Sequence, residues 1–293
     1  MALTKLQQEF KDSVGYKIED TFANIKSNYF QPVIEEEKKI IEDYEKSLFG
    51  KVGCGGAFSY GCLIPTILGF IIVSVFSGNL YVKTLVYTLM LTLSEYFLIV
   101  WYNNTEFYDK HKDSTPNHIK IIRDLLLPFT GVISQDMKDD SKITLVTNLT
   151  KINSKNNELT DNQIREKGIT IKHGLSVYES DIMDLTATMA DGTRINYNLH
   201  QLLNEVIVYK KRGNKHKAKG KITLKAVFAI PNKVYSPLPE GQIEIGNYPA
   251  LVSHSEKMQK IVIKDVTEAT NLDEASIREK AIDMMAAVYS VLG

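Results

Sequence analysis

Two long apolar stretches near the start of the chain constrain its fold more than any other feature of the sequence. Residues 57–76 contain no charged side chain, and residues 80–102 contain only Lys83 and Glu95. Because about twenty helical residues cross the hydrocarbon core of a bilayer, each stretch is long enough to form a transmembrane helix. We therefore expect a transmembrane helical hairpin at residues 57–102. The alternative is a helical hairpin buried inside a protein core.

Basic residues beside the two stretches predict the orientation of the hairpin. Lys46 and Lys51 precede it and four further basic residues follow it, whereas the short turn has only Lys83 beside it. Lysine and arginine close to a span favour the cytoplasmic side. The expected localisation is therefore an integral membrane protein with two spans and both termini in the cytoplasm. Cys54 and Cys62 would then be free thiols in a reducing compartment.

The second apolar stretch carries polar side chains on one helical face. Thr84, Thr88, Thr92 and Glu95 follow one another at intervals of four, four and three residues, which places them on the same side of a helix. A carboxyl group inside a bilayer is costly, so Glu95 indicates either an ion path or a position near enough to the interface to reach water. We favour the second interpretation and keep an ion path as the alternative.

Small residues in the first apolar stretch predict close helix packing. Gly61, Pro65 and Gly69 recur at intervals of four, and small side chains let two membrane helices approach each other. We expect this face to pack within the hairpin or between protomers of a homo-oligomer.

The remaining sequence predicts aqueous segments on both sides of the hairpin. Around it we expect an N-terminal amphipathic helical segment, a linker with a short helix that Pro128 ends, and a cytoplasmic α+β domain. These segments cover residues 1–56, 103–141 and 142–293. In the last segment, Asp191-Gly192 is typical of a hairpin turn in a mainly antiparallel sheet, and Asp273 begins a closing helix. The fold class is thus an α+β membrane protein.

Finer patterns within residues 142–293 predict individual elements. Ile169 and Ile171 alternate with polar residues, as in a short strand, whereas residues 198–204 are typical of a short helical insert. Residues 222–230 and 261–263 are rich in β-branched side chains and predict two further strands.

The segment from Asp191 to Lys233 carries the most specific resemblance to known proteins. Gly192-Thr193 leads into a strand, a basic loop and an apolar strand that ends in Asn232-Lys233. With the N-terminal helix and the two-span hairpin, this layout resembles an uncharacterised bacterial family, a domain of unknown function with a cytoplasmic β-rich domain. The glycine expected inside the last strand is absent from residues 222–230. The resemblance implies no known reaction.

A basic loop is the main candidate for partner binding. Between residues 210 and 221, seven of twelve side chains are Lys or Arg: Lys210, Lys211, Arg212, Lys215, Lys217, Lys219 and Lys221. Such a loop is either a solvated hairpin tip or a contact for anionic lipid headgroups or an acidic protein. Nucleic acid is not favoured, because no aromatic residues lie between the charges to stack on bases.

Motifs for catalysis are missing from the sequence. It contains no phosphate-binding Walker loop, no His-Glu-x-x-His, no Gly-x-Ser-x-Gly and no calcium loop, and its six histidines lack ligand spacing. We expect neither an enzyme nor a cofactor or metal site. The sequence predicts a membrane-anchored scaffolding protein, oligomeric, whose cytoplasmic domain binds an unidentified protein partner. The alternative is a channel or ion-coupled subunit that uses Glu95.

Overall fold

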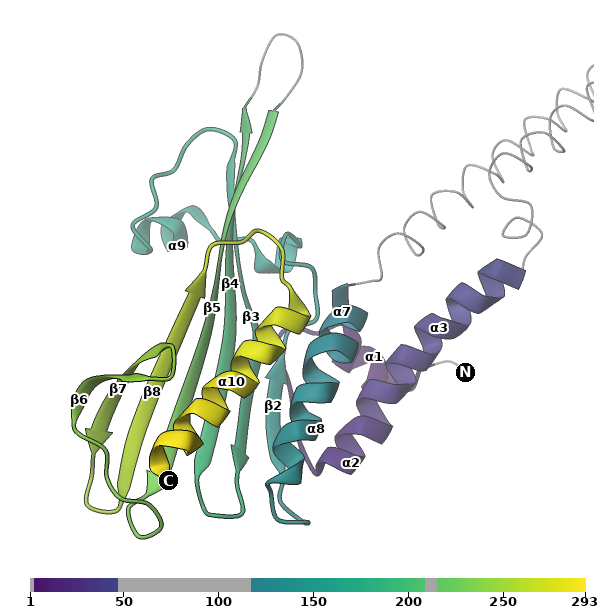
Figure 1. Cartoon of the computed structure of the whole chain (residues 1–293). Coiled ribbons are helices and arrows are strands. Elements are labelled where there is room, and N and C mark those ends of the chain that lie inside the picture. Colours follow the sequence, from purple (N-terminus) through teal and green to yellow (C-terminus); the bar gives the residue numbers. More distant parts are fainter. Residues whose placement is uncertain (1–2, 47–116, 209–214) are drawn as a thin grey trace, which may run out of the picture. The chain divides into compact units, whose positions relative to one another are not determined.

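The computed structural model describes residues 3–46, 117–208 and 215–293 (Figure 1). The chain divides into two compact units, one formed by residues 1–34 with 117–293 and the other by residues 35–116. In the second unit, the described part is the end of helix α3 (Gln31–Lys46). The fold below is that of the first unit.

A single antiparallel sheet of eight strands forms the body of this unit, in the order β1-β2-β3-β4-β5-β8-β7-β6 (Figure 1). Consecutive strands in the chain are mostly neighbours in the sheet, and the crossover from β5 to β6 places β8 beside β5. The strands are β1 Tyr16–Asp20, β2 Ile143–Thr147, β3 Leu175–Thr188, β4 Arg194–Val208, β5 Lys215–Pro231, β6 Gly241–Ile245, β7 Tyr248–His254 and β8 Met258–Thr267.

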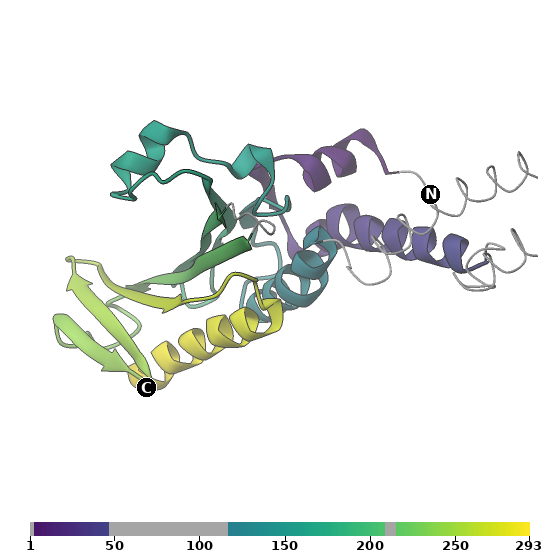
Figure 2. The ribbon, with the colours of Figure 1, turned by 90° about the horizontal axis from the view of Figure 1, so that it is seen from above.

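Helices cover one face of the sheet, where α8 and α10 lie side by side (Figure 2). The helices of the unit besides the start of α3 are α1 Lys5–Asp12, α2 Phe22–Ile25, α7 Asn117–Lys120, α8 Leu127–Gln135, α9 Asp161–Glu166 and α10 Glu274–Leu292. Short π-helical segments occupy Lys26–Phe30 and Ile121–Leu126, and a 3₁₀ turn occupies Lys155–Asn157.

Strand β4 shows how the sequence assigns the two faces. Ile195, Tyr197 and Leu199 are buried, whereas the residues between them are half-exposed, as expected for side chains that alternate across a sheet. The Tyr197 hydroxyl donates to the carbonyl of Ala281 in α10 at 2.9 Å. The Tyr197 ring packs edge-to-face on Phe129 of α8, with the two ring centroids 4.9 Å apart. Odd-numbered β4 residues therefore face the helices. We call this side the inner face and the opposite side the outer face.

Pro128 does not end its helix, contrary to the sequence prediction. Residues Asn117–Gln135 form one continuous helical run with a π-helical segment just before the proline. Proline cannot donate to the carbonyl of Asp124, four residues earlier. Arg278 of α10 donates to that carbonyl instead, at 3.1 Å. The wider π turn and this bond let the helix continue through Pro128.

The predicted fold class and localisation are corrected by the structure. The described residues form an eight-stranded antiparallel sheet with helices on one face, and none of these helices is long and apolar enough to cross a membrane. Even α10, with nineteen residues, carries charged side chains such as Glu279 and Lys280. The predictions of an α+β membrane protein, and of an integral membrane localisation with both termini in the cytoplasm, are therefore wrong. The predicted hairpin at 57–102 lies outside the described residues.

Individual elements differ from the sequence predictions as well. Residues 16–20 form strand β1 rather than a helix, because Ile18 is buried between the exposed Lys17 and Glu19 with the period of a strand. Ile169 and Ile171 lie in the connection between α9 and β3 and form no strand. Residues 198–204, expected as a helical insert, continue β4.

Candidate functional site

The outer face of the sheet is the candidate site, and its side chains follow from the strand registers. On β4, even-numbered residues lie on this face, and each is paired with an odd-numbered residue of β5. Directly paired residues of neighbouring strands lie on the same face. The register therefore identifies every outer-face position of β5 and, through the β5–β8 pairing, of β8.

A row of five lysines follows the outer face of β5. Its members are Lys215, Lys217, Lys219, Lys221 and Lys225, and we call it the lysine row. All five side chains are exposed, and none has an ion-pair partner in residues 3–46, 117–208 and 215–293. Adjacent members two residues apart lie about 6.8 Å apart along the strand. The row thus presents uncompensated positive charge in a line.

This lysine row corrects the prediction of a basic loop. From Lys215 onward the chain is strand rather than loop, so the orientation of its lysines is fixed by the pairing with β4. The other three predicted members, Lys210, Lys211 and Arg212, lie outside the described residues.

Exposed aliphatic side chains lie beside the lysines on the outer face. Lys225 is paired with Lys264 of β8, and the next outer-face row joins Val227, Val262 and Leu251 across β5, β8 and β7. Leu251 is 56% exposed. Val266, further along β8, is 43% exposed. Contiguous aliphatic side chains bordered by polar ones, such as Val227, Val262 and Leu251 beside Lys225 and Lys264, can mark a contact surface for another molecule.

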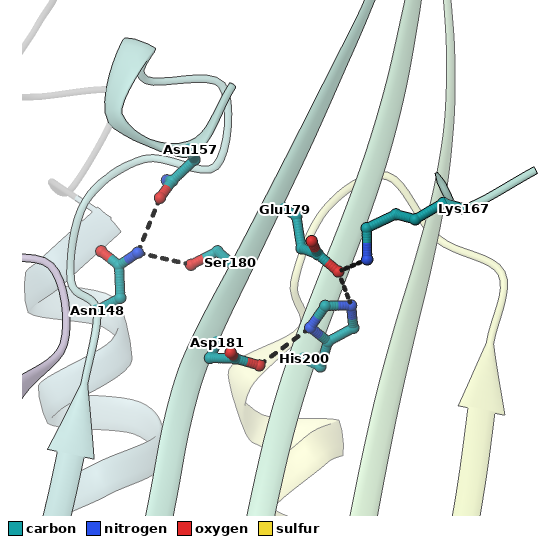
Figure 3. A network of polar contacts seen from close by, with 7 residues as sticks. All are labelled: Asn148, Asn157, Lys167, Glu179, Ser180, Asp181 and His200. Atoms are coloured by element: carbon teal, nitrogen blue, oxygen red, sulfur yellow. Dashed lines mark hydrogen bonds and ion pairs between the residues drawn. The ribbon is translucent and has the colours of Figure 1, made fainter. Parts of the chain in front are cut away.

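Acidic side chains lie on the outer face of β3, on the far side of β4 from the lysine row (Figure 3). Glu179 lies 2.5 Å from the Lys167 ammonium and 3.2 Å from Nε2 of His200, whose Nδ1 lies 3.1 Å from Asp181. Asp184 accepts from Asn196 at 2.6 Å. These carboxylates therefore already have partners, so the net positive charge of the face lies over β5 and β8.

A buried amide network holds the connection after β2 against β3 (Figure 3). The Asn148 amide nitrogen donates to Asn157 and to Ser180, both at 2.9 Å, and its oxygen accepts from the backbone and hydroxyl of Thr150. A cavity of about 360 Å³ lies beside it, lined by Glu179 and Asp181 among others. Both the nitrogen and the oxygen of the Asn148 side-chain amide therefore make two hydrogen bonds, which indicates a structural role.

The Asp191 carboxylate lies at the β3–β4 hairpin turn and binds three hydroxyl groups. Asp191 accepts from the hydroxyls of Thr193 at 3.0 Å, Tyr235 at 2.9 Å and Tyr289 at 3.3 Å. Burial and the Asp191 carboxylate raise the pKa of Tyr235, and burial is also the main reason that the pKa of Tyr289 is raised. Both phenols therefore stay protonated and act as donors, which ties α10 to the hairpin turn.

Metal binding finds no support in these clusters. Within the described ranges, no group of three or more His, Cys, Asp or Glu side chains is placed to hold a metal ion. The absence of a metal or cofactor stays a prediction.

The site residues predicted in the apolar stretches lie outside the described residues. These are Thr84, Thr88, Thr92 and Glu95 of the polar face and Gly61, Pro65 and Gly69 of the packing face, together with Cys54 and Cys62. Sequence reasoning missed the lysine row as a row, although the recurrence of lysine at every second position from 215 to 221 is the period of a strand. Sequence reasoning also missed the contacts of His200 on β4 with Glu179 and Asp181 on β3, because these residues are distant in sequence.

Comparison of the chain with family models, with curated proteins and with solved structures gives no match. The resemblance to an uncharacterised bacterial family stays a prediction.

Proposed function

We propose that the chain is a scaffolding protein without catalytic activity, whose outer sheet face binds an acidic region of another protein. The observation that carries this proposal is the lysine row: five exposed lysines on one face of β5, without ion-pair partners in the described part of the chain. Net charge does not explain the row, because the whole chain is neutral. Complementary charge at such a surface accelerates association and selects acidic partners.

The aliphatic residues favour a protein over another polyanion. Val262, Leu251 and Val266 lie on the same face as Lys225 and Lys264, and a phosphate backbone would leave these side chains in water. Protein interfaces combine an apolar centre with a polar rim. A protein partner with both apolar and acidic side chains fits the face better than nucleic acid or lipid headgroups.

The channel alternative receives no support from the described residues. It depends on Glu95, which lies outside them, and on membrane spans that no described helix provides. The basic loop predicts anionic lipid headgroups as one class of partner, and a membrane hairpin would hold the domain near a bilayer. Without that premise, lipid binding becomes an outcome of the test below.

Charge reversal on the face tests the proposal. The full chain is compared with the Lys225→Glu/Lys264→Glu variant and with a matched Lys138→Glu/Lys233→Glu control, whose lysines are exposed and lie outside the lysine row. Both variants change the net charge equally. Proteins that co-purify from the source cells are identified, and their binding is measured again with purified components.

The expected result is a partner protein with an acidic segment, whose dissociation constant rises at least about tenfold in the face variant and stays unchanged in the control. Equal loss in both variants would mean that net charge alone attracts the partner. Partners retained by both variants, or binding only to anionic vesicles or nucleic acid, would contradict the proposal.

A further inference from the structure

Strand β5 is longer than the strand that covers its second edge. Its pairing with β8 begins at Ile222, opposite Thr267, while its pairing with β4 continues to Lys215. Along Lys215–Lys221, β5 therefore has β4 on one edge and no strand of the described chain on the other. This second side of the segment is an open edge in the middle of the strand order, in addition to the outer edges of the terminal strands β1 and β6.

The hydrogen-bond pattern identifies which backbone groups point to the open edge. The Ile207 amide donates to the Gly174 carbonyl at 2.9 Å, on the β3 side of β4. Backbone groups alternate sides along an antiparallel strand, so even-numbered β4 residues bond to β5, and their partners there are odd-numbered. The N–H and C=O groups of His216 and Ala218 consequently point away from β4, toward the open edge.

The lysine row determines what kind of strand this edge accepts. Lys217 and Lys219 project from the outer face next to the edge, so the side chains of an added strand would alternate beside them. Acidic residues at every second position would pair with these lysines, whereas a second copy of β5 would place lysine against lysine, which is unfavourable. The edge therefore selects against self-association.

A cavity lies where the open edge meets the rest of the sheet. It has a volume of about 530 Å³, and its lining includes Lys219 and Lys221 of β5 and Glu268 and Thr270 of the chain after β8. The chain after β8 packs on Gly220, which also lines the cavity, so closely that a β-carbon there would lie 2.0 Å from the Ala269 carbonyl oxygen. An added strand has room to end here with a large side chain in the cavity.

We infer that the acidic partner presents an extended segment, which binds as an additional strand along the open edge at Lys215–Lys221. This inference rests on the proposed function and specifies the form of the partner. Main-chain hydrogen bonds from His216 and Ala218 supply affinity, and the lysine row supplies specificity, as in other cases of strand addition.

Proline substitution at the edge separates strand addition from simple charge attraction. Ala218→Pro removes an N–H that points to the open edge and leaves both the lysines and the pairing with β4 in place, which edge strands tolerate. Ala218→Ser, which keeps the N–H, is the matched control. His216→Pro is a second variant of the same kind, and urea unfolding confirms that each full-length variant is folded.

The probe is a synthetic peptide of alternating threonine and glutamate, with a fluorescent label for anisotropy. A second peptide of the same charge carries proline in place of alternate threonines, so that it cannot pair as a strand. We expect the first peptide to bind the wild type and the Ala218→Ser variant equally, the Ala218→Pro and His216→Pro variants at least about fivefold more weakly, and the proline peptide to bind weakly to all.

Failure of this inference is distinguishable from failure of the proposed function. Equal binding of both peptides, or equal binding by the proline and serine variants, would overturn strand addition and leave the acidic partner in place. Absence of peptide binding, while the Lys225→Glu/Lys264→Glu variant still loses its partner, would likewise overturn strand addition. If that variant loses no partner, the proposed function fails first.

Discussion

Replacing Asn148 with alanine is expected to destabilise the sheet unit strongly, because this side chain is the centre of a buried network. Asn148 is 2% exposed and takes part in four side-chain hydrogen bonds, to Asn157, Ser180 and twice to Thr150. A typical bond contributes about 0.5–1.5 kcal/mol net, so four give about 2–6 kcal/mol. Some of the former partners of Asn148 can form other hydrogen bonds in the variant. We therefore expect the free energy of unfolding to fall by about 3 kcal/mol.

Urea unfolding of the full chain, followed by tyrosine fluorescence and circular dichroism, measures this loss. The matched control is Asn198→Ala, which deletes the same amide on the outer face of β4, where Asn198 is half-exposed and has no side-chain hydrogen bond within the described ranges. We expect the control to change the free energy of unfolding by less than about 0.5 kcal/mol. Equal effects of the two substitutions would refute the argument that the network around Asn148 stabilises the fold.

Three further predictions concern Tyr197, Gly220 and His118. Tyr197→Phe removes the bond to the Ala281 carbonyl and keeps the packed ring, so the free energy of unfolding should fall by about 1 kcal/mol in urea; no change would contradict the bond. Gly220→Ala forces a β-carbon against Ala269 and should lower the unfolding free energy by about 1–3 kcal/mol, whereas a neutral result would contradict the close contact. Burial lowers the pKa of His118 from 6.5 to about 4. The unfolded chain therefore takes up this proton first, so stability falls as pH decreases from 6.5 to 4, and His118→Gln should flatten that part of the profile measured by thermal unfolding.

The local turn and cap signals predicted parts of the fold correctly. Asp191-Gly192 forms the β3–β4 hairpin turn, where Gly192 has a φ of +88° that favours glycine, and Asp191 accepts from the Thr193 amide. Asp273 caps α10 by accepting from the Ser276 amide at 3.1 Å. Both signals depend on residues close in sequence, which is why a single sequence reveals them.

The extent of the long strands could not be predicted in the same way. Asn198 and Asn204 lie on the outer face of β4, and asparagine has low strand propensity, so local sequence does not indicate that the strand continues through residues 198–204. The density of Lys and Arg predicts a loop up to residue 221, whereas strand β5 begins at Lys215. Pairing with neighbouring strands decides these segments: residues 198–204 pair with β3 and β5, and residues 215–221 pair with β4. Local propensity does not contain that information.

The candidate site was predicted in charge but not in geometry. The sequence identified Lys215, Lys217, Lys219 and Lys221 as a basic cluster, but their common face follows only from the β4–β5 register. His200 contacts Glu179 and Asp181 across strands, and the bulge between Asp181 and Met183 shifts that register by one residue. Such contacts have no signature in sequence spacing.

Amide hydrogen exchange along β5, followed by NMR with and without the threonine–glutamate peptide, tests the central claim most directly. In the free chain, the amides of Lys217 and Lys219 should exchange slowly, because they bond to β4, and those of His216 and Ala218 should exchange quickly at the open edge. The peptide should slow His216 and Ala218 and leave the two lysine amides almost unchanged. Slow exchange at all four positions in the free chain, or no additional protection with saturating peptide, would contradict a partner-binding edge on β5.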